Sequence, residues 1–386
     1  MIRRILAQIH LWLGLILCLP LVLLGLTGSV LVFEDELREA FAPPLAASPG
    51  EARPVADMIA AARNAAPEGY VPLSYGAPPL PGRLAWVRLG PPRRAPGPDA
   101  VRVEVDPVTL QTYPDQQAGL LRQVFFLHAN LLVKNREGRQ LVGGLGVVML
   151  AMGLSGLVNW WPRRGQWRRS FGVSRAAGGV RLHREMHGMA GIWGLAVFLV
   201  VSFGGVYLAF PETVRSVVDA LVPARDLRAA ANAIKVEPIS GARPLAVDEA
   251  IALARSRVPD TTLRMVFLPS RPEQPLRVLL MPAGAERMAP SATVFVDPWR
   301  SRVVEVFEPR SFSAGETMLA WQHALHAGHG FGRGWQMLVF LSGFLPLLFV
   351  VTGVTMWWLK RRRRAAPAAV SDPLLDPAYT PRRAGE

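Results

Sequence analysis

The sequence predicts a membrane α-helical protein, with four transmembrane helices that arise from an internal duplication and two α+β domains outside the cytoplasm. Three observations predict this fold class. The 386 residues are 51% hydrophobic, and the apolar residues gather in four long blocks. Basic residues crowd beside one end of each block, as they do at the cytoplasmic ends of membrane spans. The two halves of the chain also repeat the same landmarks in the same order.

Each apolar block is long enough to cross a bilayer, which takes about 20 residues in a helix. None of the blocks contains Asp, Glu, Lys or Arg. The first block follows an Arg pair, as in a signal peptide, but its apolar run is too long and has no convincing cleavage site before Phe33. We therefore expect it to be retained. The predicted spans are Ile5–Phe33, Leu141–Trp161, Gly188–Phe210 and Trp335–Leu359.

The basic flanks set the expected direction of the spans, because Lys and Arg are enriched on the cytoplasmic side. We expect a multi-pass protein of the bacterial inner membrane, with both termini in the cytoplasm and the soluble domains in the periplasm. The formal charge of +14 comes largely from these flanks and does not indicate nucleic-acid binding. The flanking residues are Arg3, Arg4, Arg163, Arg164, Arg168, Arg169, Arg175, Arg181, Arg184 and Lys360 to Arg364.

The domain organisation follows from these spans. Transmembrane helices are expected over residues 1–33, 141–161, 188–210 and 335–359, with periplasmic domains over 34–140 and 211–334, a cytoplasmic loop over 162–187 and a basic cytoplasmic tail over 360–386. Each periplasmic domain ends in a histidine-containing stretch before the next span. Helical spacing of apolar residues predicts a helix over Val247–Arg257, and alternation predicts strands at Arg102–Val105 and Thr293–Val296 before Asp-Pro turns.

The internal duplication is predicted from matches at nearly constant spacing. In the first helix of each half, a small-residue cluster follows eighteen residues after a histidine, at Gly28 after His10 and at Gly205 after His187. Other landmarks repeat in the same order. They are Leu127-His128-Ala129 with Leu325-His326-Ala327, Trp160-Trp161 with Trp357-Trp358, and Ala52-Arg53-Pro54 with Ala242-Arg243-Pro244.

The histidines of the repeat predict cofactor sites. Because successive helices alternate in direction, His10 and His187 share the cytoplasmic side, and His128 and His326 share the periplasmic side. A neutral imidazole offers a nitrogen lone pair and no net charge, so two of them can ligate haem iron between helices without burying an uncompensated ion. The two pairs therefore predict two haems b, one near each face of the membrane. The next candidates are His183, His323 and His329.

Other interpretations of the histidines are open. A histidine at a membrane interface is often only a hydrated amphipathic residue. A zinc or copper site built from His323, His326 and His329 is an alternative, although no carboxylate or thiolate stands nearby to complete it. The single cysteine, Cys18, allows neither an internal disulfide nor a cysteine cluster. No catalytic residue is predicted.

Several short motifs follow one another in an order that matches a known family. They are His-x-x-x-Gly from His10, Thr-Gly-Ser at Thr27–Ser29, Leu-His-Arg at Leu182–Arg184, and Leu-His-Ala before a helix that ends in Thr-Gly and then Trp-Trp. From about Ile2 to Arg364 the chain resembles the PepSY-associated transmembrane family of iron-regulated inner-membrane proteins, and within it the siderophore reductases that act on ferric hydroxamates such as ferrioxamine.

The resemblance implies an oxidoreductase with two PepSY-like periplasmic domains and two haems b, which carries electrons outward to iron held by a siderophore. By position it assigns His10 and His187 to the inner haem, and His128 and His326 to the outer one. Fe(II) is held far more weakly than Fe(III) by hard oxygen ligands, so one electron releases the metal. No flavin or nicotinamide motif is found, so a quinol or a cytoplasmic reductase is the expected donor.

Two further functions compete with reduction. PepSY domains elsewhere resemble regulators of secreted peptidases, so the chain could be a membrane-anchored regulator of periplasmic peptidases without redox activity, but an anchor needs no matched histidines. A siderophore transporter is the other, since duplicated halves are common in transporters. The absence of charged residues from the predicted spans argues against a polar pathway. In the reductase reading, the candidates for docking the ferric complex are Trp321, Trp335 and Arg310.

Overall fold

The structure is a computed structural model of the 386 residues, and it describes all of them except 42–44, 92–99, 116–118, 134, 287 and 366–386. The chain forms two compact units. One comprises residues 1–22, 151–195 and 345 onward, and the other comprises residues 23–150 and 196–344. Most of the basic tail expected over 360–386 lies outside the described residues, and its first part continues helix α14 (Leu345–Ala365).

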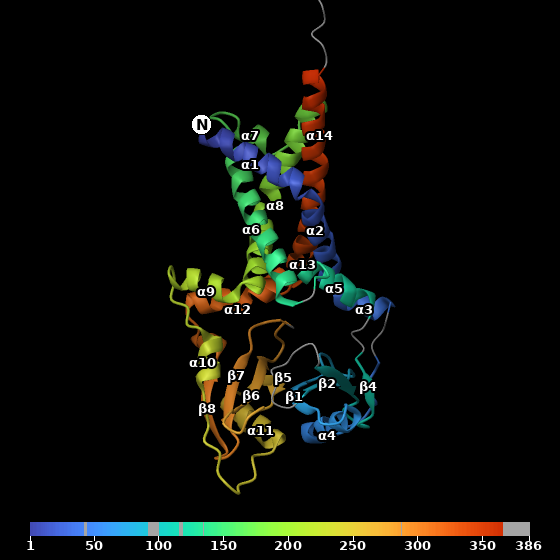
Figure 1. The fold of residues 1–386 in the computed structure, drawn as a ribbon, viewed down its shortest axis with the longest axis vertical. Coiled ribbons are helices and arrows are strands. Elements are labelled where there is room, and N and C mark those ends of the chain that lie inside the picture. Colours follow the sequence, from blue (N-terminus) through green and yellow to red (C-terminus); the bar gives the residue numbers. More distant parts are fainter. Residues whose placement is uncertain (42–44, 92–99, 116–118, 134, 287, 366–386) are drawn as a thin grey trace, which may run out of the picture. The chain divides into compact units, whose positions relative to one another are not determined.

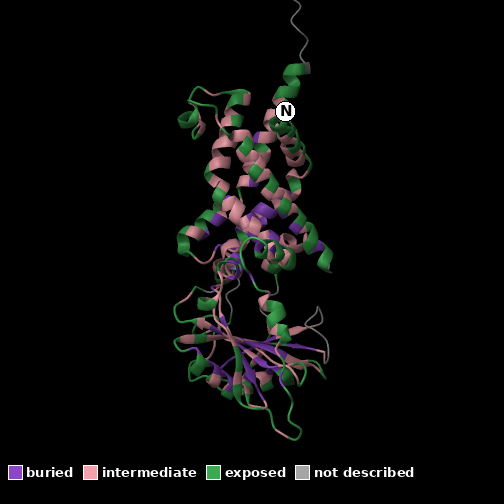
Figure 2. Ribbon diagram, turned by 90° about the vertical axis from the view of Figure 1, so that its left-hand side faces the viewer, coloured by how far each residue is buried: buried purple, intermediate pink, exposed green. Residues whose placement is uncertain are grey.

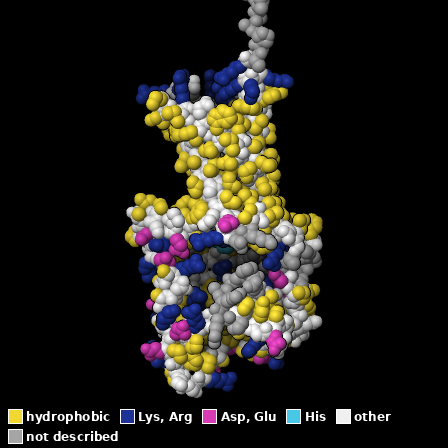
Figure 3. All heavy atoms as spheres, in the orientation of Figure 1, with side chains coloured by type: hydrophobic (Ala, Val, Ile, Leu, Met, Phe, Trp, Pro, Cys, Tyr) yellow, Lys and Arg dark blue, Asp and Glu magenta, His cyan; other side chains and the backbone are white. Residues whose placement is uncertain are grey.

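The described residues contain three helical segments that are long and apolar enough to cross a membrane. They are α6 (Asn135–Trp160), α8 (Gly179–Ala209) and the segment Gly332–Arg364, which joins α13 (Gly332–Ser342) to α14. The first predicted span is instead a bent pair, α1 (Ile2–Ile16) and α2 (Cys18–Val32), with 70° between the two helices. The count of spans is four if this pair is one span. On the face seen in Figure 3, hydrophobic side chains cover most of the helical part.

Proline accounts for both helix interruptions. A proline has no N–H to donate, and its ring crowds the carbonyl group four residues earlier. Pro20 stands four residues after Ile16, where α1 ends, and Pro346 stands four residues after Ser342, where α13 ends. The interruption after Ile16 is the reason that the predicted span Ile5–Phe33 is bent.

The remaining elements are mostly short and, apart from α7, belong to the unit of residues 23–150 and 196–344 (Figure 1). The helices are α3 (Glu34–Phe41), α4 (Val55–Ala65), α5 (Leu120–Asn130), α7 (Trp167–Ser170), α9 (Pro211–Asp219), α10 (Leu227–Ala233), α11 (Val247–Arg257), a 3-10 turn at Pro309–Ser311 and α12 (Ala314–His326). The strands are β1 (Val71–Gly76), β2 (Ala85–Gly90), β3 (Val101–Val105), β4 (Thr112–Pro114), β5 (Thr261–Phe267), β6 (Leu276–Pro282), β7 (Ala292–Asp297) and β8 (Arg302–Phe307). The helix predicted at Val247–Arg257 and the two predicted strands are confirmed.

The strands of both soluble segments join in one antiparallel sheet, in the order β4-β3-β2-β1-β5-β6-β7-β8. The sequence predicts two separate soluble domains, and the structure differs by pairing their edges. Strand β1 of the first segment pairs with β5 of the second, with Tyr75 opposite Val266. An unpaired central edge would leave a row of backbone N–H and C=O groups open to other chains, and this pairing satisfies them.

The core of the sheet lies on the face that packs against α4 and α11. Strand residues such as Val87, Val105, Val278 and Val294 are fully buried there, and Ala62 and Ala254 of the two helices pack against them. Figure 2 shows the buried residues concentrated in the strands. The burial of apolar area on this single face stabilises both halves of the sheet together, at roughly 25 cal/mol per Å².

A carboxylate strengthens the junction between the halves. Asp248, in the first turn of α11, accepts hydrogen bonds from the backbone N–H groups of Val55 (2.7 Å) and Ala56 (2.9 Å) in the first turn of α4. The first N–H groups of a helix have no partner within the helix, and they carry the positive end of its dipole. One side chain from the second segment therefore caps a helix of the first.

We predict that Asp248→Ala loosens the start of α4, since the loss of a capping carboxylate costs about 1 kcal/mol. Hydrogen exchange of the solubilised protein, followed by mass spectrometry, should show roughly fivefold faster exchange at Val55 and Ala56. Asp57→Ala is the matched control, because among the described residues the Asp57 carboxylate pairs only with Arg53, in an exposed ion pair. Equal exchange in the Asp248→Ala variant and the unmodified protein would contradict the capping role.

Candidate functional site: two histidine pairs

The first pair of histidines joins α1 to α8 within one compact unit. The ring centroids of His10 and His187 are 6.2 Å apart, with the ring planes at 65°. These two histidines are the ones that match in the sequence repeat, one on the first helix of each half. The structure therefore brings together two imidazoles that are 177 residues apart in the chain.

Both rings of the first pair are oriented by hydroxyl groups. His10 Nδ1 lies 2.9 Å from Ser155 Oγ, and His187 Nδ1 lies 2.9 Å from Thr352 Oγ1. Each hydroxyl also donates to a carbonyl oxygen of its own helix, from Ser155 to Met152 (3.2 Å) and from Thr352 to Leu348 (2.7 Å). Because each hydroxyl proton is used in this way, the oxygen accepts from Nδ1–H, and Nε2 keeps its lone pair for another partner.

The second pair joins α5 to α12 within the other unit. The ring centroids of His128 and His326 are 5.9 Å apart. His128 Nδ1 donates to the carbonyl oxygen of Leu24 (3.1 Å) and lies 3.1 Å from Thr27 Oγ1, while His326 Nδ1 donates to the carbonyl oxygen of Val201 (2.8 Å). A carbonyl oxygen can only accept, so Nδ1 carries the proton in both rings and Nε2 again keeps a lone pair.

Both imidazoles of the second pair are uncharged because they are buried. Burial, and to a lesser extent the nearby imidazole of His326, lowers the pKa of His128 to about 4. Burial also lowers the pKa of His326 below its usual value, although its bond to Val201 opposes this. Desolvation disfavours the charged imidazolium, so both rings are available as uncharged ligands at neutral pH.

All four rings lie against glycines of the neighbouring helix. A Cβ atom at Gly28 would lie 3.0 Å from Cε1 of His128, and one at Gly205 would lie 3.1 Å from Cε1 of His326. The corresponding distances are 3.4 Å from Gly156 to His10 and 3.9 Å from Gly353 to His187. The first two sites leave little room for any side chain, so glycine lets each ring approach the helix backbone that holds its Nδ1.

The geometry fits a metal held between two imidazoles. A metal bound at about 2.0–2.1 Å from each nitrogen separates two ring centroids by roughly 6 Å, as in both pairs. Two neutral nitrogen donors without a carboxylate or thiolate suit haem iron, whose macrocycle supplies the other four ligands. Within the described part of the chain, no group of three His, Cys, Asp or Glu residues could hold an ion, so the alternative site of His323, His326 and His329 is not formed.

The other three histidines lie beside the pairs without entering them. His183 precedes His187 by one helical turn, and its Nδ1 is buried without a hydrogen-bond partner among the described residues. His323 is exposed, and the backbone N–H of His329 donates to the carbonyl of Ala324 (2.8 Å). The structure thus separates the four repeat-matched histidines from their neighbours.

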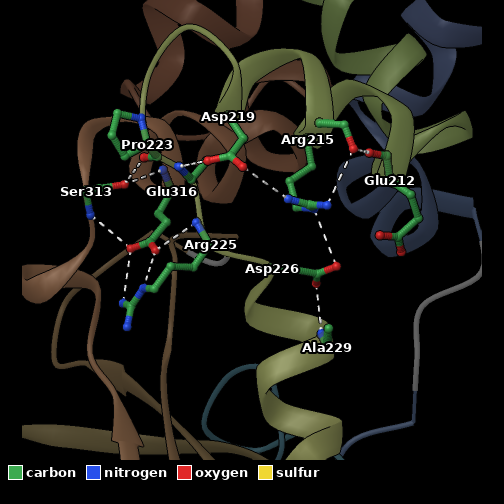
Figure 4. Close-up of polar contacts among 11 residues, drawn as sticks. Glu212, Arg215, Asp219, Pro223, Arg225, Asp226, Ala229, Ser313 and Glu316 are labelled. Carbon is green, nitrogen blue, oxygen red and sulfur yellow. Dashed lines mark hydrogen bonds and ion pairs between the residues drawn. The ribbon is translucent and has the colours of Figure 1, made fainter.

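Helix α12, which carries His326, is anchored at its start (Figure 4). Ser313 and Glu316 form a reciprocal capping box, with Ser313 Oγ accepting from the N–H of Glu316 (3.1 Å) and the carboxylate of Glu316 accepting from the N–H of Ser313 (2.9 Å). Arg225 Nε donates to the same carboxylate (2.6 Å) and keeps the pKa of Glu316 below its usual value. This anchoring positions the helix from the end opposite to the histidine.

The residues suggested for docking have structural contacts of their own. Trp321 stacks on Phe331, with ring centroids 6.3 Å apart and planes at 10°. Trp335 Nε1 donates to the carbonyl oxygen of Leu325 (3.1 Å), next to His326. Arg310 is exposed in the 3-10 turn. Both tryptophans support the turn that follows α12, and their docking role is still a prediction.

Sequence reasoning missed the groups that hold the imidazoles. Ser155, Thr352 and Thr27 each stand directly before a glycine that faces a histidine. The signal was present as a Ser-Gly or Thr-Gly pair in three of the four spans, but it cannot be separated from ordinary small-residue helix packing without coordinates.

The fold and the paired imidazoles define a membrane protein with an antiparallel sheet domain and two candidate haem sites. The sequence matches the family of the PepSY-associated TM region over residues 7–360, and the chain belongs to this family. No curated protein matches the sequence closely.

If the first pair holds haem, we predict that Thr352→Val weakens its binding, because a hydrogen-bond partner of a ligating histidine contributes about 10- to 100-fold in affinity. The measurement is the rate of haem transfer from the purified protein to excess apomyoglobin. Thr355→Val is the control, since its exposed hydroxyl bonds only the carbonyl of Val351 in the same helix. Equal transfer rates from the two variants would show that the Thr352 hydroxyl does not orient the ligand.

Proposed function

We propose that this protein is an inner-membrane di-haem reductase that passes electrons across the membrane to a ferric siderophore in the periplasm, releasing Fe(II) for uptake. The observation that carries this proposal is the recurrence of one arrangement at two places, a histidine pair about 6 Å apart with each Nδ1 hydrogen-bonded and each ring beside a glycine. A membrane anchor or a transporter has no need of this arrangement.

The proposal also includes the orientation of the chain in the membrane and the evolutionary origin of its two halves. Both termini lie in the cytoplasm, so His10 and His187 hold the inner haem b, and His128 and His326 hold the outer one. An internal duplication accounts for the likeness of the two halves. Gly28 lies against His128 as Gly205 lies against His326, and Gly156 lies against His10 as Gly353 lies against His187. Each half thus supplies one ligand to each pair.

The residues of the chain perform three tasks in this mechanism. The Nδ1 hydrogen bonds fix the tautomer of each histidine and leave the lone pair of Nε2 for a metal. The apolar spans exclude water from the carriers and keep their surroundings at low dielectric. Helix α8 contributes to both sites, with His187 in one and the carbonyl of Val201 in the other.

A haem b bound at each pair supplies a one-electron carrier. The overall reaction balances when a donor such as a quinol or a cytoplasmic reductase gives up one electron for each siderophore-bound Fe(III) reduced to Fe(II). A ferric hydroxamate is the substrate class implied by the resemblance. The released Fe(II) is bound weakly by the hard oxygen ligands that retained Fe(III).

The proposal predicts two haems b per chain, measured as pyridine haemochrome in protein purified from cells supplied with iron and haem. His128→Ala and His326→Ala should each lose the outer haem, and His10→Ala and His187→Ala the inner one. His183→Ala and His329→Ala are the controls and should keep both. In dithionite-reduced protein freed of excess reductant, addition of ferrioxamine should restore the oxidised spectrum and yield Fe(II).

A colourless protein from such cells would overturn the proposal and direct attention to regulation of periplasmic peptidases. Haem that remains reduced in the presence of ferric siderophore, without formation of Fe(II), would contradict the substrate assignment while leaving the haem sites in place.

A further inference from the structure

The second face of the sheet, opposite α4 and α11, carries a row of basic and aromatic residues. The strand register places Arg88 of β2 beside Ser74 of β1, Ser74 beside Phe267 of β5, and Phe267 beside Arg277 of β6. Residues directly opposite one another on neighbouring strands point to the same side of a sheet. Arg88 and Arg277 therefore flank the junction between the two halves, with Cα atoms three strand spacings or about 14 Å apart.

This row does not belong to the apolar core. The residues that alternate with it along the strands, such as Val87, Val266 and Val278, are fully buried against the helices on the other face. Arg88 is exposed, and Phe267 and Arg277 are partly exposed, whereas Ser74 is buried at 4% exposure. The accessible part of the row is therefore its two arginines and Phe267.

Neither arginine of this row has an acidic partner among the residues that the structure describes. Arg277 lies over the ring of Phe267, with its guanidinium carbon 5.1 Å from the centroid, and partial burial lowers its pKa. By contrast, Arg102 on the neighbouring β3 lies 3.3 Å from Glu104 and 3.8 Å from Asp115. A partly buried cation without a counter-ion favours binding of an anion, because desolvation is costly unless the charge is paired.

One contact joins the sheet to the segment that follows α12, within the same compact unit. Glu286, in the loop between β6 and β7, accepts hydrogen bonds from the backbone N–H groups of Gly330 and Gly332 (2.8 Å to the latter).

We propose that the surface formed by Arg88, Phe267 and Arg277 binds the ferric complex, and that it selects complexes of net negative charge, such as hydroxamates that also carry citrate-type carboxylates. This inference rests on the proposed function and narrows its substrate class. The two guanidinium groups donate paired hydrogen bonds to carboxylate oxygens, and the Phe267 ring covers the apolar arms of the chelator.

The acidic residues near this surface leave it positive. On the same face, Glu104 is engaged by Arg102, and Glu305 lies on the edge strand β8, two strands beyond Arg277. A neutral trihydroxamate gains no ion pair there, so the surface discriminates by charge rather than by the iron-binding groups.

The test uses Ga(III) in place of Fe(III), because Ga(III) keeps the charge and geometry of the complex and takes up no electron. Binding of the Ga(III) complexes of a citrate-based dihydroxamate, which is anionic, and of a neutral trihydroxamate is measured by calorimetry with the solubilised protein. We expect the anionic complex to bind at least tenfold more tightly, and to weaken as salt is raised. Arg277→Gln and Arg88→Gln should each reduce its affinity about tenfold, Arg277→Lys should reduce it less, and the neutral complex should be unaffected.

Arg257→Gln, which removes an exposed charge from α11 on the other side of the sheet, is the matched control and should bind both complexes normally. Equal affinity for the two complexes, or unchanged binding in both Arg→Gln variants, would overturn the inference. Haem content and the circular dichroism spectrum report whether each variant is folded. Binding of a Ga(III) complex needs no electron transfer. A lack of preference for the anionic complex can therefore be distinguished from a failure of the reductase proposal.

Discussion

The hydrogen bond at Nδ1 of each paired histidine is the interaction on which the rest of the structure depends. An imidazole ligates through one nitrogen, and it can be aimed only if the other is held. Here the holding groups belong to neighbouring helices, namely Ser155, Thr352, Leu24 and Val201. The helices must therefore approach closely, and glycines beside the rings make that approach sterically feasible.

The two pairs are held in related but unequal ways. The first pair donates to hydroxyl oxygens, whereas the second donates to backbone carbonyls, with Thr27 as an additional neighbour of His128. A carbonyl in a helix cannot be lost by substitution, so the second pair depends less on the identity of its partner residues. The capping box and Arg225 at the start of α12 also hold the second pair in place, because they fix the helix that carries His326.

Three features were predictable from the sequence because their signals are local or periodic. Hydropathy indicated the spans, helical spacing indicated the soluble helix Val247–Arg257, and the register of the repeat indicated which histidines pair. The 70° bend at Leu17 was not, since a proline within an apolar segment is compatible with either a straight or a broken span. The joining of both soluble segments in a single sheet was not predictable either. Nothing in the residues of β1 or β5 specifies that these two edges pair with each other, and the row from Arg88 to Arg277 exists only once they do.

The strand order of the sheet reads the same from either end, four strands of one half meeting four of the other at an antiparallel seam. Such a seam is what two identical chains would form around a two-fold axis, because each edge then offers the same surface to its copy. Under the duplication proposed above, the ancestor is a homodimer whose subunits shared every site. In this account, both halves inherit a hydroxyl partner for one histidine and a carbonyl partner for the other. Fusion then allowed the two copies to diverge, as at Thr27 beside His128, whose counterpart in the second half is Gly204.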